Sequence, residues 1–348
     1  MGGPVRGKGP QYRPSRGFEP PGADTRRRCP APRPVSPCPD TLGGVTSPGD
    51  PDVLVPPPAR AAILAWYAEA ARPLAFRRTG DPYAVLVSEL MAQQTQAVRA
   101  AEAWTTWIAR WPTPAELASA PVADVLRAWA SLGYNRRAVA LRRAAQVIVA
   151  EHGGRVPDDV AALEALPGVG PYTARAVAAI AFGRAVGAVD TNVRRVLGRV
   201  AAGGADALAP RDLQALADAV VPADAAGPWT HALMDVGALL CAPQAPRCGE
   251  CPAATWCRHA AGERPDAHGS RRAGRAGQAV PFPLTRRWLR GRVLDLARAA
   301  PDGAWVAYAE PIGTHAASAV REAVLLLASE GLLDAREGSD GVEARLPG

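Results

Sequence analysis

Residues 166–192 read LPGVGPYTARAVAAIAFGRAVGAVDTN, and this stretch decides the fold of the chain. Its hairpin needs both Gly168 and Gly170, because the backbone turns tightly there and must approach a neighbouring group closely. Pro171 follows, and proline is favoured at the first position of a helix. The free N–H groups at such a helix start point outward, so this turn can bind an anion.

Helical patterns flank the hairpin on both sides. Residues 158–165 precede it, and small apolar side chains after Tyr172 lead to the sequence VDTN at 189–192. The stretch therefore predicts a helix, a hairpin and a second helix, with an aspartate at a fixed distance beyond them. A plainer interpretation stays open here, in which Asp190 only caps the next helix of a packed pair.

The length, charge and apolar content of the chain limit the number of domains, the kind of partner and the compartment that we expect. The chain has 348 residues, of which 48% are apolar, and a net charge of +7 that arginine mainly supplies. This length allows two domains and a small third one, and the charge suits a polyanionic partner. No apolar run reaches the length of a membrane span, and no apolar segment follows the N-terminus as in a signal peptide. We therefore expect a cytoplasmic, nucleoid-associated protein of bacterial type.

Four parts of different composition follow one another. Residues 1–57 are rich in Pro, Gly and Arg, which predicts a disordered tail. Residues 58–262 show helical periodicity and almost no strand signal, which predicts an all-α body. Residues 263–283 form a basic linker, and residues 284–348 form a small module. The helices expected in the body span residues 59–71, 82–92, 95–110, 114–119, 121–131, 135–152, 158–165, 171–183, 189–202, 210–220 and 227–240.

The C-terminal module has a mixed pattern. Helical runs cover residues 286–299 and 314–330, and a turn at 338–341 separates two short strand-like runs. Two helices followed by a β-hairpin predict a small winged-helix-like α+β module.

A polar stretch interrupts the apolar helices of the body. Residues 88–96, SELMAQQTQ, place Glu89 near the end of an apolar helix and follow it with amides and a hydroxyl. Side chains such as Gln94 and Thr95 can read base edges or fill the gap left by a displaced base. A polar junction between two helices is the alternative.

A second turn, LGYNRR at residues 132–137, places an aromatic residue beside two arginines at a helix start. One interpretation is that Tyr134 is a wedge and that Arg136 and Arg137 bind phosphates. A packed tyrosine beside a solvated basic turn is the alternative, and it is the simpler one for this turn alone.

Four cysteines are crowded near the end of the body with the spacing C-x6-C-x2-C-x5-C. Clustered cysteines in a reducing compartment bind metal more often than they form disulfides. The spacing differs from the paired C-x2-C knuckles of common zinc sites, and thiolates this close can surround an iron–sulfur cube. The pattern predicts a metal centre and favours [4Fe–4S] over zinc. Its expected ligands are Cys241, Cys248, Cys251 and Cys257.

The combination of LPGVGPYTA, VDTNV and the cysteine loop resembles the helix-hairpin-helix DNA glycosylase superfamily. SELMAQQTQ narrows the resemblance to the MutY-type adenine DNA glycosylases. It covers about residues 60–262, with the motifs in the family's order. It implies a two-lobed body, with a helical barrel lobe at about 82–188. The N-terminal helix and residues 189–262 make the iron–sulfur lobe.

The resemblance implies a monomeric enzyme that flips adenine out of duplex DNA, opposite 8-oxoguanine or guanine, and hydrolyses its glycosidic bond. Glu89 matches the family's catalytic acid, and a carboxyl in an apolar wall has a raised pKa. Asp190 matches the carboxylate that stabilises the cationic sugar, and Asn192 matches an amide that helps to hold it. Tyr172 stands where endonuclease III relatives carry a Schiff-base lysine, which implies base removal without strand cleavage.

Other matches concern the contacts with DNA. Gln94 and Tyr134 match residues that enter the helix around the orphaned base, and Arg77 matches an arginine near the acid. Ala92 stands where many members have Leu, and His231 where others often carry Gln or Glu thought to read the adenine edge. The expected DNA-binding residues are Gln94, Thr95, Tyr134, Arg136, Arg77, Gly168, Gly170 and His231.

The C-terminal module departs from the family's pattern. Many members carry a Nudix-like domain there that senses 8-oxoguanine, and residues 284–348 are too few for a domain of ~100–150 residues. We therefore expect weaker discrimination between 8-oxoguanine and guanine opposite adenine.

Three other functions stay open. A sister glycosylase that removes thymine or uracil shares the tyrosine, the aspartate and the cysteine loop, but Glu89→Gln would spare much of its activity. An endonuclease III-type lyase would give a Schiff base that borohydride traps, although Tyr172 disfavours it. A non-catalytic DNA-binding module could use the same hairpin, but two acids facing a phosphodiester would weaken its binding.

Overall fold

The computed structural model describes residues 49–263, 280–339 and 341–348. Most of the expected tail and linker therefore lies outside the described residues. The prediction of a tail to residue 57 was too long, because helix α1 (Pro51–Leu54) forms and Val55 is buried against the body. The prolines here were misleading, since proline at a first helical position starts a helix. The described residues belong to one compact unit.

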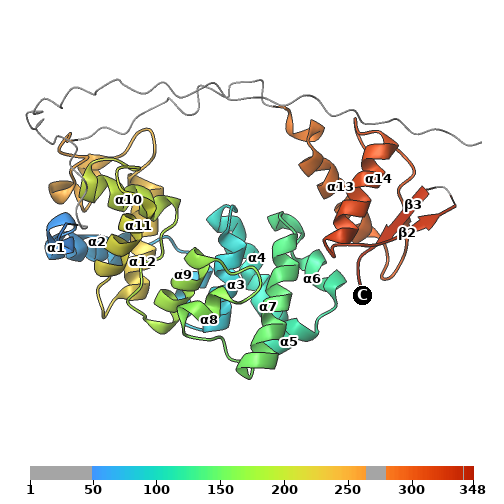
Figure 1. The fold of residues 1–348 in the computed structure, drawn as a ribbon, viewed down its shortest axis with the longest axis horizontal. Helices are drawn as coiled ribbons and strands as arrows, with labels where there is room; N and C mark the ends of the chain where they lie inside the picture. Colours follow the sequence, from blue (N-terminus) through green and yellow to red (C-terminus); the bar gives the residue numbers. More distant parts are fainter. Residues whose placement is uncertain (1–48, 264–279, 340) are drawn as a thin grey trace, which may run out of the picture. The chain divides into compact units, whose positions relative to one another are not determined.

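The body is helical, as predicted (Figure 1). Several helices start with proline, and Thr113 and Glu116 form a reciprocal capping box at another start. The π-helical turn η3 (Val236–Leu240) ends the helix that the sequence predicted as continuous to 240. The helices are α2 (Pro57–Ala70), α3 (Pro82–Ala92), α4 (Ala97–Arg110), α5 (Pro114–Ser119), α6 (Val122–Ala128), α7 (Arg136–His152), α8 (Val160–Glu164), α9 (Pro171–Phe182), α10 (Thr191–Ala202), α11 (Pro210–Ala219) and α12 (Ala226–Asp235), with the short 3₁₀ turns η1 (Ala75–Arg78) and η2 (Ala130–Leu132) between them.

Two clusters of buried apolar residues form the core of the described residues. The first contains side chains from α3 to α9, with the fully buried Trp107 and Trp129 among its largest. The second contains side chains of α2, α10, α11 and α12 around Trp229. Helix α9 contributes to both, with Ala174 in the first and Ala179 in the second. Side chains on α3, α9, α10 and α12 can therefore meet where the two clusters join.

The hairpin before α9 uses its two glycines differently. Gly168 has φ 81°, and a Cβ there would lie 2.8 Å from the Cβ of Ala140, so this position requires glycine. Gly170 has φ −101° as the N-cap of α9, and a Cβ would meet nothing within 4 Å. The expectation that the turn itself needs both glycines was wrong for Gly170. The open space there leaves the start of α9 accessible to an anion.

The C-terminal module has two helices and a small sheet. Helices α13 (Arg286–Ala299) and α14 (Ala317–Ser329) precede a hairpin of β2 (Asp334–Gly338) and β3 (Gly341–Arg345), in agreement with the predicted order. The sequence pattern missed β1 (Val306–Ala307), whose two residues are too few to show a period. The antiparallel sheet has the order β1-β3-β2, with Ala335 opposite Ala344.

The module packs against the first core cluster of the body. Leu289 and Val293 of α13 belong to that cluster. The Ala123 N–H donates to the Pro347 carbonyl at 3.0 Å, and Arg298 Nε donates to the Leu126 carbonyl at 3.1 Å. None of the described helices is long and apolar enough to span a membrane.

Candidate active site

A buried carboxylic acid lies on α3. Glu89 is 7% exposed in a helix whose neighbouring residues are almost all apolar. Tyr172 on α9 donates a hydrogen bond from its hydroxyl to Glu89 Oε2 at 2.9 Å. Burial raises the pKa of Glu89 to about 7, with the Tyr172 hydrogen bond lowering it and the Asp190 charge raising it. Glu89 is therefore shared between its neutral and charged forms near neutral pH.

Tyr172 remains a hydrogen-bond donor at any physiological pH. Burial, followed by the charges of Glu89 and Asp190, holds the pKa of its hydroxyl well above the ordinary value. The same hydroxyl lies 3.9 Å from the sulfur of Met234. This position contains no amine, so it supplies no nucleophile for a Schiff base.

Asp190 lies at the start of α10 and is half-buried. Its Oδ1 accepts from the Val193 N–H at 2.6 Å, so it is the N-cap of the helix. Its Oδ2 accepts from Asn192 Nδ2 at 2.9 Å. The interpretation of Asp190 as the N-cap of α10 is confirmed, and the cap holds this carboxylate near enough to Glu89 for its charge to raise the pKa of Glu89.

Asn192 is itself held by a basic residue of the next turn. Arg195 Nη2 donates to Asn192 Oδ1 at 2.8 Å and to the Gly237 carbonyl at 2.6 Å, and Arg195 Nε donates to the Cys241 carbonyl at 2.6 Å. Gly237 allows this approach, since a Cβ there would lie 2.5 Å from the Cβ of Asn192. Hydrogen bonds therefore connect the cysteine loop to the carboxylate of Asp190.

A second buried acid, which the sequence analysis missed, lies on α12. Asp235 is fully buried and accepts from Arg72 N at 3.1 Å, Arg72 Nε at 2.6 Å and both terminal nitrogens of Arg77, Nη2 at 2.7 Å. Burial alone would raise the pKa of Asp235, but the hydrogen bonds and charges of Arg77 and Arg72 outweigh it, and the pKa is lowered. The signal was present, because Asp235 is a lone acid in an apolar helix, as Glu89 is.

Arg77 is therefore an ion-pair partner of Asp235, and it is too buried to bind a phosphate. Its side chain is 7% exposed, and its Nε has no hydrogen-bond partner among the described residues. Buried donors in folded proteins are usually hydrogen-bonded, so this unpaired N–H is an unusual feature of the site.

His231 lies on the same helix, against Tyr67. The two rings are 6.3 Å apart between centroids, and the Arg77 guanidinium lies 5.7 Å from the Tyr67 ring. Burial, with help from the Arg77 charge, lowers the pKa of His231 to about 3. Its imidazole is therefore neutral, with one nitrogen able to donate and the other able to accept a hydrogen bond.

The two turns expected to enter DNA share an unusual backbone. Gln94 has φ 52° and Tyr134 has φ 45°, and these are the non-glycine residues with positive φ in the described parts of the chain. Both side chains are exposed. Backbone of this kind costs about 1–3 kcal/mol unless its surroundings hold it in place.

Arg137 holds both turns, so the interpretation of this side chain as a phosphate ligand was wrong. Its Nη1 donates to the carbonyls of Leu90 at 2.8 Å and Gln93 at 2.5 Å. Its Nη2 lies 3.3 Å from the Thr95 hydroxyl and from the Gly133 carbonyl. The neighbouring Arg136 is exposed at the start of α7 and stays available to DNA.

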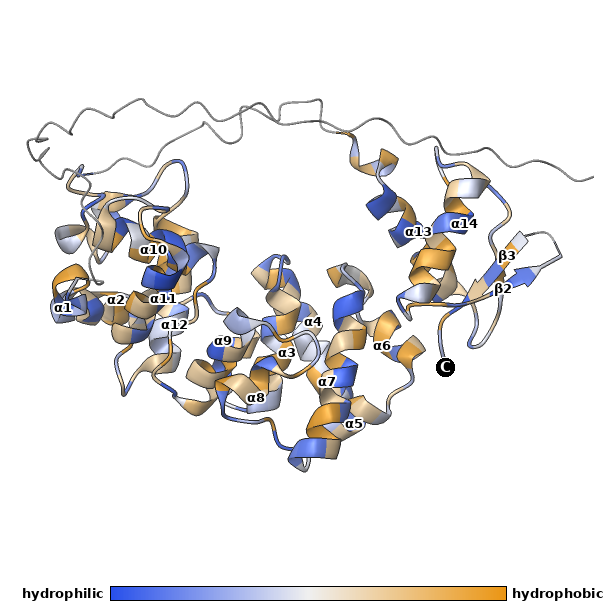
Figure 2. Ribbon diagram, viewed as in Figure 1, coloured by the Kyte–Doolittle hydropathy of each residue, from blue (hydrophilic) through white to orange (hydrophobic). Residues whose placement is uncertain are grey.

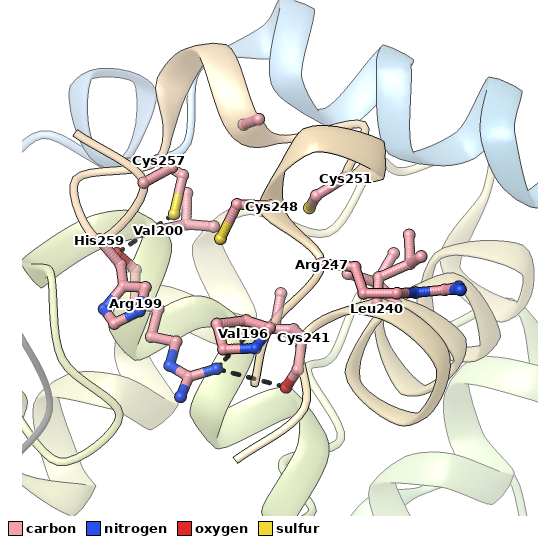
Figure 3. Close-up of a pocket in the computed structure, with 14 residues that line it drawn as sticks. Val196, Arg199, Val200, Leu240, Cys241, Arg247, Cys248, Cys251, Cys257 and His259 are labelled. Carbon is pink, nitrogen blue, oxygen red and sulfur yellow. Dashed lines mark hydrogen bonds between the residues drawn. The ribbon is translucent and has the colours of Figure 1, made fainter. Parts of the chain in front are cut away.

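The four cysteines line one pocket (Figure 3). None forms a disulfide, and burial raises the pKa of the Cys251 thiol to about 11. Buried thiols become thiolates readily only beside a positive charge such as a metal centre. No three acidic, His or Cys side chains of the described residues are close enough together for a single metal ion. Four sulfur donors line one pocket, and thiolates are the ligands that hold iron–sulfur clusters in proteins.

Comparisons with known proteins agree with this geometry. Residues 87–222 match the HhH-GPD superfamily of base excision DNA repair proteins. The chain is 48% identical to the adenine DNA glycosylase of Mycobacterium tuberculosis (strain ATCC 25618 / H37Rv) over 244 residues, which are 68% of this chain and 78% of that protein.

Two solved structures share the fold. A thermostable thymine-DNA glycosylase is similar with a TM-score of 0.55 and 30% identity, over 58% of this chain and 95% of that one. An endonuclease III in a non-covalent DNA complex has a TM-score of 0.51 and 23% identity. This match covers 59% of this chain and 94% of that one. The extent of the mycobacterial match and its identity show that this chain belongs to the adenine DNA glycosylases of base excision repair.

Proposed function

We propose that the enzyme removes adenine mispaired with 8-oxoguanine or guanine from duplex DNA and that it leaves an abasic site without cutting the strand. The observation that carries this proposal is the pair of carboxyl groups at the junction of the two core clusters. Glu89 is buried with a pKa of about 7, and Asp190 lies beside it on a helix start. The neutral form of Glu89 is poised to give a proton, and the Asp190 side chain lies beside it at the start of α10.

In the proposed reaction, neutral Glu89 donates its proton to N7 of an adenine that has flipped out of the helix. The bond between N9 and the sugar C1′ then breaks, and the electron pair leaves with the base. The Asp190 carboxylate stabilises the positive charge left on the sugar. Water adds to C1′, and its proton returns to a carboxylate. Tyr172 donates to Glu89 and holds it at the base, and it offers no amine for strand cleavage.

Other residues of the pocket are proposed to select the base. Neutral His231 and the free Nε of Arg77 offer hydrogen bonds to polar atoms of the adenine. Gln94 and Tyr134 enter the helix beside the orphaned base, and Arg136 and the start of α9 near Gly170 bind phosphates.

We further propose that Cys241, Cys248, Cys251 and Cys257 hold a [4Fe–4S] cluster. When bound, such a cluster supplies bonds that fix the loop, because it ties four thiolates of one segment together. Arg195 then holds Asn192, and through it Asp190, in a fixed position relative to that loop. The partner is duplex DNA, as in the complex of the structurally similar endonuclease III. We propose that the enzyme acts as a monomer, in the bacterial cytoplasm at the nucleoid.

Single-turnover base release on a panel of duplexes tests the proposal. The panel contains A opposite 8-oxoguanine, A opposite G, T opposite G and U opposite G, and wild type is compared with Glu89→Gln and Asp190→Asn. We expect adenine release that both variants lose by at least about a hundredfold, with alkali needed to nick the product. Release of T or U instead, with Glu89→Gln active, would place the enzyme with the thymine/uracil glycosylases. Nicking without alkali would contradict the monofunctional mechanism.

A further inference from the structure

Helix α13 of the C-terminal module carries one arginine that differs from the others. Among the described residues, Arg287 has no carboxylate within ion-pair distance, and it is exposed. In Figure 2, α13 carries several hydrophilic segments, drawn in blue. The other arginines of α13 all have acidic partners, in the pairs Arg286–Glu322, Arg290–Glu330, Arg292–Asp295 and Arg298–Asp295.

Arg287 instead lies over the aromatic ring of the expected wedge. Its guanidinium carbon is 4.4 Å from the centre of the Tyr134 ring, and the guanidinium of Arg137 is 5.3 Å from the same ring. Tyr134 is 42% exposed. Two cations beside one ring, with no carboxylate on Arg287, give this surface a positive potential that suits a polyanion.

The contact is anchored by a second arginine of the same helix. Arg298 Nη2 donates to Asn135 Oδ1 at 2.6 Å, and its Nε donates to the Leu126 carbonyl at 3.1 Å. The side chain of Arg298 is 9% exposed, so these bonds are shielded from water. Helix α13 is thus fixed to the residue that follows Tyr134, and Arg287 keeps its place beside the wedge.

We propose that Arg287 and Tyr134 form a composite contact with the DNA strand that carries the base opposite the adenine. Arg287 binds a phosphate next to the base step that Tyr134 enters. A guanidinium matches phosphate in charge and geometry, and a phosphate contact fixes the register of the protein on the duplex. The inference rests on the proposed function, because that function places Tyr134 beside the orphaned base.

Binding to an uncleavable duplex tests Arg287 against its neighbour on the helix. The probe carries a tetrahydrofuran abasic site opposite 8-oxoguanine, and full-length wild type, Arg287→Ala and Arg286→Ala are titrated over a series of salt concentrations. We expect Arg287→Ala to bind roughly tenfold more weakly and its salt slope to fall by about 1. Arg286→Ala, whose charge is paired with Glu322, should change affinity less than about twofold. Equal affinities and slopes for the two variants would overturn the proposal.

A scan of neutral methylphosphonates along both strands identifies the phosphate. In wild type, one substitution on the strand of the orphaned base should weaken binding. In Arg287→Ala the same substitution should have no further effect, because the contact is already lost. A partner phosphate on the adenine strand, or additive losses at every position, would overturn the assignment. Thermal unfolding of each variant shows whether it folds like wild type.

The two proposals fail in different ways. If wild type binds the probe but releases no adenine from a mispair, the proposed function is wrong, and the same binding data still decide whether Arg287 contacts that strand. If wild type releases adenine and Arg287→Ala binds like Arg286→Ala, the contact alone is wrong.

Discussion

Helices α3 and α12 each bury one acid near Arg77, and the two acids behave in opposite ways. Glu89 has a tyrosine hydroxyl as its close polar partner, and burial raises its pKa to about 7. Asp235 is buried as well, yet the hydrogen bonds and charges of Arg77 and Arg72 keep its pKa below the ordinary value. Burial alone therefore does not decide the charge of a carboxyl group, since the cations that share its site do.

This difference gives Glu89 and Asp235 different roles. A buried carboxyl that is not ion-paired, such as Glu89, can lend a proton, which is what protonation of a leaving base requires. A carboxylate fixed by two arginines cannot lend one, but it can hold Arg77 and the helix around His231 in place. Substitutions of the two acids, and of the tyrosine that bonds to Glu89, test this division.

The largest effect is expected where a paired charge is broken. Asp235→Asn removes the anion and leaves Arg77 buried without a counter-charge, so the free energy of unfolding should fall by about 3–5 kcal/mol. Urea unfolding measures this change in the free energy of unfolding. The matched control is Asp206→Asn, whose partner Arg194 is exposed, and it should lose less than about 1 kcal/mol. Equal stability of Asp235→Asn and wild type would mean that the buried pair contributes nothing.

A smaller and pH-dependent effect is expected at Glu89. The unfolded chain ionises Glu89 at its ordinary pKa of 4.5 and the folded chain at about 7, so wild type loses stability as the pH rises between these values. Glu89→Gln does not ionise there. It should be more stable than wild type by about 3 kcal/mol above pH 7, and the gain should vanish below about pH 4.5. Unfolding curves from pH 4 to 9 measure it, with the exposed Glu102→Gln as control. A gain that is the same at all pH values would argue against the raised pKa.

The smallest effect is expected from Tyr172→Phe. The Tyr172 hydrogen bond lowers the pKa of Glu89, so its loss should move the pH at which adenine release declines upward by less than about one unit. Single-turnover rates between pH 5 and 9 show the shift. Tyr308→Phe removes a buried tyrosyl hydrogen bond far along the chain, to the Val293 carbonyl, and should leave the profile in place. A downward shift in Tyr172→Phe would contradict the assigned role of the hydrogen bond.

Local patterns in the sequence predicted most helices and brought the right residues to attention. Helix periodicity, proline starts and the glycine hairpin act over a few residues, so they can be read along the chain. They predicted α3 over residues 82–92 and α13 over 286–299 without error. The polar stretch at residues 88–96 drew attention to Glu89, and the family resemblance pointed to Tyr172. The structure joins these two side chains by a hydrogen bond.

What the sequence did not predict depends on contacts between distant segments. Arg77 and Asp235 are 158 positions apart, and nothing local indicates that one neutralises the other. The same holds for Arg137, which looks like a phosphate ligand in LGYNRR but turns inward to carbonyls of the α3 end. Arginine patterns in a sequence indicate charge, whereas the direction of each side chain follows from packing.

Arg137 also has a consequence for how this enzyme can change. One side chain anchors the turns of Gln94 and Tyr134, although these residues are 40 positions apart in the chain. The single residue Arg137 therefore positions both turns that are expected to enter DNA. Any substitution of Arg137 removes hydrogen bonds from both turns at once, so it should alter the positions of Gln94 and Tyr134 together.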